Sequence, residues 1–249
     1  MIYITGDTHR DFRRLYSLGG KKGDMLIILG DSGINYCLDE RDVELKEYLN
    51  NFGYKLFCIR GNHEERPSNI DSYIEVPMFG GKVYIEPQFP NLIFAKDGEI
   101  YEIDGKRVLV IGGAYSVDKE NRIRYGTGKW FRDELLTYQE MDEILYKVKG
   151  QRFDVVLTHT CPYKYEPREV FLPFIDQNKV DKTMEHFLDE IDQNIEYDKW
   201  YCGHYHIDKE IDKIEFMFKI ISPFYRKPNV ERKRKKDTEW YLFSFLYIV

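Results

Sequence analysis

The sequence predicts an α/β (α+β) protein in which two β-sheets pack together between flanking helices, and three features support this fold class. Five short apolar runs each end at a glycine or a threonine, which is the pattern of strands buried on both faces. Residues 38–52 lie between two of these runs and space their apolar residues as an amphipathic helix does, so strand and helix alternate. Around Asp104-Gly105 the pattern changes to that of an antiparallel hairpin.

The individual elements follow from the same patterns. The five apolar runs predict strands that end near residues 5, 29, 59, 158 and 202. Shorter strands are expected at 92–94, 99–103 and 107–111, and later ones at 209–221 and 239–249. Helical spacing predicts helices at 38–52, 133–148 and 180–195, the second of which stops at Gly150.

Composition and charge limit the class of protein. With 249 residues, 43% of them hydrophobic and 32% charged, the chain has the composition of a globular protein, and we expect residues 1–249 to form one domain. A net charge of −6 argues against the whole molecule being a nucleic-acid partner. We expect neither a signal peptide nor a membrane partner, because no basic leader precedes the first strand and no apolar run approaches ~18 residues.

The cysteines indicate a reducing compartment. Cys37, Cys58, Cys161 and Cys202 are widely spaced and form no CxxC pair, so neither a disulfide scaffold nor a cysteine zinc site is predicted. We therefore expect a cytoplasmic protein.

Side chains that can bind metal follow each of the five apolar runs. They include five of the six histidines, and the full set is Asp7, His9, Asp31, Asn62, His63, His159, His204 and His206. Ligands of α/β sheets gather beyond the carboxyl ends of the strands, so these side chains are expected to converge. Imidazole and oxygen ligands without thiolate suit Mn, Fe or Zn. The set is too large for one tetrahedral zinc, which favours two divalent metal ions.

In sequence order, these blocks resemble the calcineurin-like metallophosphoesterases. The matching blocks are Asp-x-His at 7–9, Gly-Asp at 30–31, Gly-Asn-His-Glu at 61–64, the lone His159, and Gly-His-x-His at 203–206. The resemblance implies a four-layer αββα sandwich of two mixed β-sheets flanked by helices. It also implies a phosphoric ester hydrolase, a phosphatase or phosphodiesterase that cleaves a phosphomonoester or phosphodiester.

The resemblance further implies a role for each residue. One metal would be held by Asp7, His9, Asp31 and His206, and the other by Asp31, Asn62, His159 and His204, with Asp31 bridging. A metal-bridging hydroxide would attack phosphorus. His63 would be the catalytic residue that stabilises the phosphoryl oxygens or protonates the leaving oxygen.

Two positions depart from known patterns of this family. The protein-phosphatase branch continues its Gly-Asp block as Gly-Asp-x-x-Asp-Arg-Gly, whereas this chain has Ile34 and Asn35 in place of that Asp and Arg. We therefore do not expect a phosphoprotein substrate of that type. Arg10 stands where many members carry glycine, and the sequence leaves its contact with substrate or solvent open.

Other interpretations of the chain stay open at this point. Residues 112–133 fit an ordinary exposed loop anchored by Trp130, or one wall of the site in which Arg122 or Arg124 holds phosphate. The basic run at 226–236 is typical of a solvated loop, and it is also the one feature that favours a nuclease acting on DNA or RNA. A non-catalytic scaffold of the same fold that binds proteins is a further alternative, disfavoured by the complete ligand set.

Overall fold

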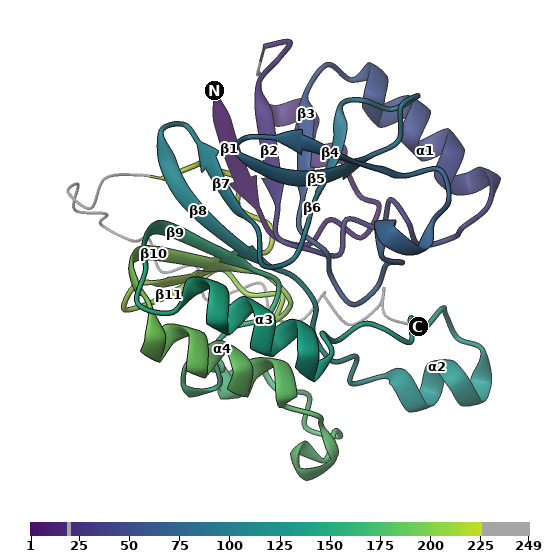
Figure 1. The fold of residues 1–249 in the computed structure, drawn as a ribbon. Helices are drawn as coiled ribbons and strands as arrows, with labels where there is room; N and C mark the ends of the chain where they lie inside the picture. The colour runs from purple at the N-terminus through teal and green to yellow at the C-terminus, as the bar shows by residue number, and fades with distance from the viewer. Residues whose placement is uncertain (19–20, 226–249) are drawn as a thin grey trace.

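The computed structural model describes residues 1–18 and 21–225, which form two mixed β-sheets (Figure 1). The strands of the first sheet lie in the order β13 (Ser222–Pro223), β1 (Ile2–Thr5), β2 (Met25–Ile28), β3 (Lys55–Cys58), β6 (Leu92–Ala95), β5 (Gly81–Ile85) and β4 (Ile74–Met78). Its four central strands, β1, β2, β3 and β6, are parallel, and antiparallel strands extend both edges.

The second sheet repeats this plan. Its strands lie in the order β11 (Lys209–Ile211), β12 (Ile214–Phe216), β10 (Glu196–Cys202), β9 (Arg152–Thr158), β8 (Lys106–Ile111) and β7 (Ile100–Ile103). Strands β12, β10, β9 and β8 are parallel, and β11 and β7 pair antiparallel at the two edges. All the strands whose ends carry the candidate ligands are therefore inner, parallel strands of one sheet or the other.

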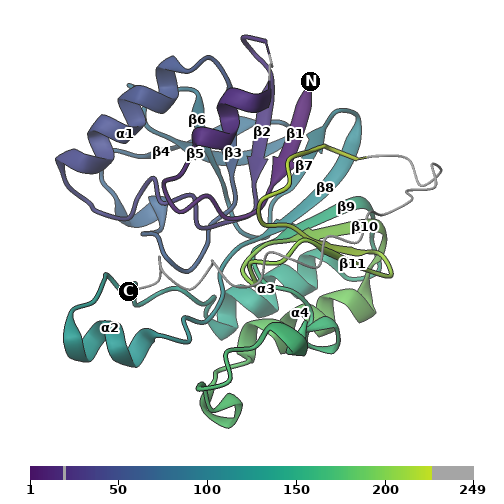
Figure 2. The same ribbon diagram turned by 180° about the vertical axis from the view of Figure 1, so that it is seen from behind.

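Three apolar layers define the order of helices and sheets. The inner faces of both sheets share one core, in which Ile27 and Leu29 of the first sheet pack with Val110 and Leu157 of the second. The outer face of the first sheet packs against α1 (Glu40–Asn51) and the 3-10 helix η1 (Arg13–Leu18) through residues such as Leu49. The outer face of the second packs against α3 (Tyr138–Val148) and α4 (Thr183–Asn194). Figures 1 and 2 show α1 on the opposite side of the molecule from α3 and α4, so the predicted αββα sandwich is confirmed.

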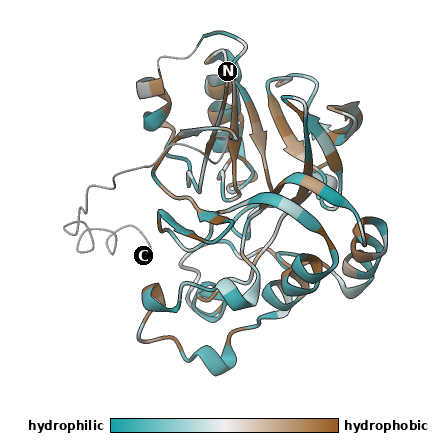
Figure 3. Ribbon diagram, turned by 90° about the vertical axis from the view of Figure 1, so that its left-hand side faces the viewer, coloured by the Kyte–Doolittle hydropathy of each residue, from teal (hydrophilic) through white to brown (hydrophobic). Residues whose placement is uncertain are grey.

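The alternation of neighbours in β2 shows why the strands are apolar throughout. Ile27 faces the inner core while Leu26 and Ile28 face α1 and η1, because successive side chains of a strand point to opposite faces. All three are fully buried. Figure 3 shows the same property as hydrophobic colour along the strands between the two layers of helices.

Some element boundaries differ from the sequence prediction. The helix expected at 133–148 begins at Tyr138, because Thr137 and Glu140 form a capping box that fixes its start. The single strand expected at 209–221 is wrong: the chain turns at Asp212, with φ 52°, and forms the β11–β12 hairpin. The β4–β5 hairpin was not predicted. It turns at Phe79-Gly80, where both residues have positive φ.

The remaining elements are short, and some predicted segments fall outside the described residues. The 3-10 helices are η2 (Pro67–Asn69), η3 (Tyr163–Tyr165), η4 (Arg168–Val170) and η5 (Gln177–Lys179), and α2 spans Lys119–Tyr125. The hairpin at Asp104-Gly105 is confirmed as the β7–β8 turn. The strand expected at 239–249 and the basic run at 226–236 lie beyond residue 225, outside the described residues. No helix among residues 1–18 and 21–225 is long and apolar enough to cross a membrane.

Candidate metal centre

The candidate ligands come from both sheets and meet where the carboxyl ends of their parallel strands face each other. Asp7 follows β1, Asp31 follows β2 and Asn62 follows β3 in the first sheet. In the second sheet, His159 follows β9, and His204 and His206 follow β10. The two edges are in direct contact, since His159 Nδ1 lies 2.7 Å from the Leu29 carbonyl oxygen at the end of β2. The sequence predicted convergence at one sheet edge, and the structure extends this to two edges.

Asp7, His9 and His206 form one group able to hold a cation. Their nearest ligand atoms lie within 4.8 Å of one another. Nε2 of His206 is 2.9 Å from Nε2 of His9 and 3.1 Å from Oδ2 of Asp7. The Asp7 side chain is buried, whereas those of His9 and His206 are 37% and 30% exposed, so this side of the centre is accessible from solvent.

A second group consists of Asp7, Asp31 and His159, whose ligand atoms also lie within 4.8 Å of one another. The carboxylate common to both groups is that of Asp7, whereas the resemblance implied Asp31 as the bridge. Asn62 joins the second group, because its Oδ1 lies 2.8 Å from Nε2 of His159. The ring of His204 lies against that of His159, with centroids 5.1 Å apart.

The contact between His159 and Asn62 tests whether these residues fit a cation. Nδ1 of His159 lies against the Leu29 carbonyl oxygen, so a metal-binding ring would keep its proton on Nδ1 and offer the lone pair of Nε2 to a cation. The Asn62 amide nitrogen donates to Ser116 Oγ at 2.9 Å, so Oδ1 is the atom that faces His159. His159 Nε2 and Asn62 Oδ1 lie 2.8 Å apart, so one divalent cation would be bound by both atoms. A backbone carbonyl on the far nitrogen is a common second partner of a metal-binding histidine.

The protonation states also suit metal binding. Burial raises the pKa of Asp7, but the hydrogen bond to His206 and the charges of nearby histidines outweigh it and hold the pKa well below its usual range. Burial likewise opposes ionisation of Asp31, yet His159 and His63 lower its pKa to about 2. Both carboxyl groups are therefore ionised at neutral pH, which concentrates negative charge that needs a cation.

The backbone of the ligand loops is strained. Ten non-glycine residues among those described have positive φ, and four of them are candidate ligands: His9 at 45°, Asp31 at 47°, His204 at 66° and His206 at 51°. Such conformations cost of order 1–3 kcal/mol each and persist where the surrounding structure enforces them, which is common at functional sites.

The glycines that precede Asn62 and His204 each make room for another candidate ligand. A Cβ atom on Gly61 would lie 1.9 Å from Oδ1 of Asp31, and one on Gly203 would lie 2.3 Å from Oδ1 of Asp7. The sequence pattern indicates tight turns as the reason for these glycines. The structure adds that at Gly61 and Gly203, where φ is not positive, close approach of a carboxylate is the reason.

His63 lies at the rim of the centre and is not part of either group. Its backbone N–H donates to Oδ1 of Asp31 at 2.8 Å, and its ring centroid is 6.0 Å from that of His9. Burial lowers the pKa of His63, and Nδ1 has no hydrogen-bond partner in the described part of the chain. The His63 ring thus lies next to the candidate ligands, and its Nδ1 makes no hydrogen bond to the described residues.

The structure also identifies residues that sequence reasoning passed over. Glu64 is buried and links two ligand loops, because it accepts hydrogen bonds from the Gly61 N–H at 3.0 Å and from Ser32 Oγ at 2.5 Å. Ser116 supports Asn62 from a distant loop, and nothing in the sequence around it indicates this. Arg10, whose contacts the sequence leaves open, pairs with Asp42 and donates to the Gly33 carbonyl at 2.8 Å.

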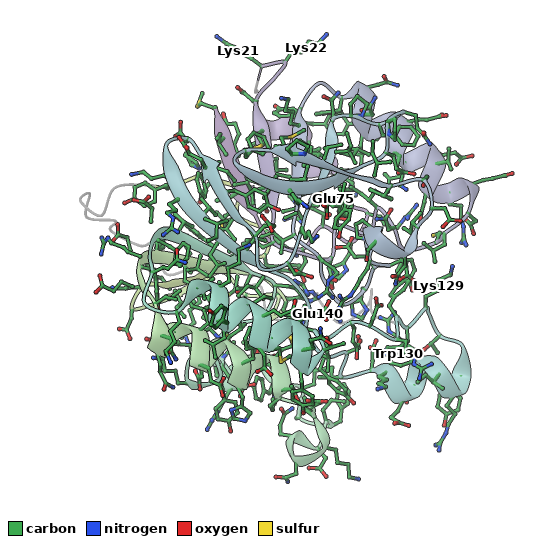
Figure 4. The ribbon with its side chains drawn as sticks, in the orientation of Figure 1. Lys21, Lys22, Glu75, Lys129, Trp130 and Glu140 are labelled. Carbon is green, nitrogen blue, oxygen red and sulfur yellow. The ribbon has the colours of Figure 1, made fainter. Side chains whose placement is uncertain are left out.

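A cavity of about 360 Å³ lies elsewhere, among η2, β6 and the start of α3. Its charged lining is internally paired: Arg66 binds Glu140 at 2.7 Å and Lys147 binds Glu99 at 3.1 Å. Glu140 is labelled in Figure 4. Because these charges neutralise each other, the candidate metal ligands are the better candidates for a functional site than this cavity.

Comparison with known proteins gives one family. A family model described as calcineurin-like phosphoesterase matches residues 1–208, which includes every candidate ligand. The comparison with curated proteins gives no match. Among solved structures, the chain is similar to the crystal structure of TT1561 of Thermus thermophilus, with 14% sequence identity, a TM-score of 0.39, and coverage of 82% of this chain and 80% of that chain.

Proposed function

The chain belongs to the calcineurin-like phosphoesterase family, and from this premise we propose that it hydrolyses a phosphomonoester or phosphodiester with two divalent cations. The proposed ligands are Asp7, His9, Asp31, Asn62, His159, His204 and His206. The observation that carries the proposal is the convergence of His159 Nε2 and Asn62 Oδ1, 2.8 Å apart, next to two ionised buried carboxylates. Mn, Fe and Zn all suit these ligands.

The protein residues would divide the work of catalysis. When bound, two divalent cations would polarise the phosphoryl group and lower the pKa of water. Asp31 fixes the loop of His63, because its Oδ1 accepts the His63 N–H. The His63 imidazole would hold a proton toward the leaving oxygen. This role needs a side chain beside the substrate whose ordinary pKa lies near neutral pH.

Buried residues after the Gly-Asp block support a substrate other than a phosphoprotein of the protein-phosphatase type. Ile34 and Asn35 are fully buried, and Asn35 Oδ1 accepts a hydrogen bond from the Tyr73 hydroxyl at 3.0 Å. Both side chains point into the protein, so neither can supply the carboxylate or the guanidinium that this branch carries there.

The first experiment is elemental analysis of the purified protein, followed by hydrolysis of p-nitrophenyl phosphate and bis-p-nitrophenyl phosphate with added Mn²⁺. We expect about two metal ions per chain and metal-dependent turnover, and the preferred ester would separate monoester from diester chemistry. A chain that takes up no Mn²⁺ and stays inactive would overturn the proposal in favour of the protein-binding scaffold.

Two variants assign the roles. Asp31→Asn should lose metal, because it removes a buried ligand charge. His63→Ala should keep metal and lose ~10²- to 10⁴-fold in rate, the usual contribution of an acid–base group. His186→Ala is the matched control, since His186 lies in α4 and its ring contacts Tyr163 with centroids 4.3 Å apart. Loss of metal in His63→Ala would show that the roles are assigned wrongly.

A further inference from the structure

Arg122 is a cation near the candidate metal centre. Other residues hold its guanidinium in place, but one of its nitrogen atoms donates no hydrogen bond within the described residues. It belongs to α2, which Figure 1 shows set apart from both sheets. Its side chain is only 13% exposed although no residue of this short helix is buried. The arginine therefore folds back from α2 toward the protein.

Three hydrogen bonds and a glycine fix the position of the guanidinium. Nε donates to Oδ2 of Asp118 at 2.7 Å, and Nη1 donates to the Lys129 carbonyl at 3.0 Å and to the Tyr36 hydroxyl at 3.3 Å. A Cβ on Gly128 would lie 2.8 Å from both Nη1 and the Tyr36 hydroxyl oxygen, so the missing side chain makes room for this contact. Nη2 has no hydrogen-bond partner among the residues that the structure describes.

The neighbours of Arg122 connect it to two of the ligand loops. Tyr36 stands in the loop that follows the ligand Asp31, and Ser116, two residues before Asp118, binds the ligand Asn62. His63 Nδ1 and Asp118 Oδ1 are buried and have no partner in the described chain. Of these two atoms, His63 Nδ1 is the one that a substrate can use, because the Asp118 carboxylate would repel a phosphoryl oxygen.

Other arginines near the centre are less suited to bind substrate. Arg10 is committed to Asp42 and to the Gly33 and Arg41 carbonyls. Arg14 donates to the carbonyl oxygens of Asp7 and Phe218, behind the ligands. Arg124 is exposed on α2. Figure 4 labels Lys129 and Trp130 on the segment after α2; Lys129 donates to the Cys37 carbonyl, and Lys119 lies 4.4 Å from the Trp130 ring centre.

We propose that Arg122 binds a non-bridging oxygen of the substrate's phosphoryl group through Nη2, an inference that rests on the proposed phosphoester hydrolysis. A guanidinium already fixed on its Nε and Nη1 side loses little conformational freedom on binding an anion. Charge-assisted hydrogen bonds to phosphate are stronger than neutral ones, and Nη2 is the guanidinium nitrogen whose N–H groups remain to donate. Of the two arginines that the sequence offers for this role, the structure therefore assigns Arg122.

The experiment measures binding of inorganic phosphate to the Mn²⁺-loaded full-length protein by titration calorimetry, next to kcat and KM for the preferred nitrophenyl ester. Arg122→Ala should weaken phosphate binding and lower kcat/KM by roughly 10- to 100-fold, the usual effect of losing a hydrogen bond to a charged group. Arg122→Lys keeps the charge without the fixed Nη2 donor and should fall between Arg122→Ala and the wild type. Arg124→Ala, which removes the same charge from the same helix, should bind phosphate within about twofold of the wild type.

Tyr36→Phe separates substrate binding from anchoring of α2. It removes one acceptor of Arg122 and leaves the guanidinium, so phosphate affinity should change by only a few-fold. Equal losses in Tyr36→Phe and Arg122→Ala would show that Arg122 only anchors the helix and would overturn the inference. Unchanged phosphate binding in Arg122→Ala, with two Mn²⁺ bound and an active wild type, would also overturn it. A wild type that takes up no Mn²⁺ would instead refute the proposed function itself.

Discussion

Replacing Gly61 by alanine tests whether the spacing of the ligand loops sets metal binding. Gly61 precedes Asn62, and its φ is not in the left-handed region, so alanine is allowed by the backbone and only the added methyl group matters. That methyl would lie 1.9 Å from Oδ1 and 2.2 Å from the backbone N of Asp31. Rotation of the Asp31 side chain relieves the first contact but not the second. We therefore expect the loops after β2 and β3 to separate.

The size of the effect follows from these distances. Ordinary contact of a Cβ begins at 3.4 Å, so the gap to the Asp31 nitrogen is short by the difference between 3.4 Å and 2.2 Å, about 1.2 Å. A shift of that size breaks the 2.8 Å hydrogen bond from the His63 N–H to Asp31. Displacement of a reacting group by about 1 Å can cost ~10²-fold in rate. Overpacking costs typically ~1–3 kcal/mol, which lowers the Tm of a chain this size by roughly 2–12 °C.

The assay is Mn²⁺ titration by calorimetry with metal analysis after gel filtration, together with the nitrophenyl ester rate and a thermal melt. Gly105→Ala is the matched control: Gly105 has φ +67° and no atom within 4 Å of an added Cβ, so alanine there strains a turn without touching the site. It should lower Tm and leave Mn²⁺ binding unchanged. A folded Gly61→Ala protein with wild-type Mn²⁺ affinity and rate would refute the spacing argument.

Two further predictions concern buried charges outside the ligand set. Lys46→Met should lower the free energy of unfolding by about 3–5 kcal/mol in urea, because it leaves Glu86 buried without its 2.6 Å ion-pair partner; a loss below about 1 kcal/mol would contradict this. Burial raises the pKa of Glu185 to about 7 from 4.5, so the folded state binds more protons than the unfolded state within that range. The free energy of unfolding should therefore fall by on the order of 3 kcal/mol as pH rises from about 4.5 through 7. Urea unfolding at pH 5 and at pH 8 measures this difference. The difference should be smaller in Glu185→Gln than in the wild type.

Much of the fold could be predicted because the buried parallel strands carry a strong local signal. Ile27 and its neighbours are apolar on both faces since sheet packs on sheet on one side and on helix on the other. The β4–β5 hairpin lacks that signal. Its strand β4 contains Pro77 and is an edge strand, half-buried to exposed, so its residues are not forced to alternate between apolar and polar.

The predicted ends of helices and strands were wrong where polar side chains, and not the apolar pattern, determine where an element starts or stops. Apolar Leu135 and Leu136 continue the spacing of α3 backward, but the helix starts only after Thr137 because the capping box with Glu140 satisfies its first N–H groups. After β10, Asp212 takes a positive φ and reverses the chain, which a count of apolar residues does not reveal.

The candidate site shows the same division between local and distant information. The predicted ligands follow the ends of five strands, with Asp7 and His9 both after β1 and His204 and His206 both after β10. The sequence therefore carries their positions, and the fold brings the strand ends together. Which carboxylate is shared depends on how the two sheets meet. Asp7 reaches both groups because Gly203, from the other sheet, leaves room beside it and the His204 N–H holds its Oδ1 at 3.0 Å.

The residues that surround the ligands were beyond sequence reasoning for a physical reason. Arg122 and Arg124 are the same residue type, two positions apart in the sequence. Because α2 has only seven residues, no periodicity distinguishes them. The distinction comes from Tyr36, some 86 positions away, whose hydroxyl accepts from Arg122 and from the Lys129 N–H. The candidate ligands are therefore encoded by strand ends, whereas the proposed substrate wall around Arg122 is encoded by contacts between loops. This difference explains why the candidate ligands can be predicted from the sequence, while the substrate must be found by measuring what Arg122 and its neighbours bind.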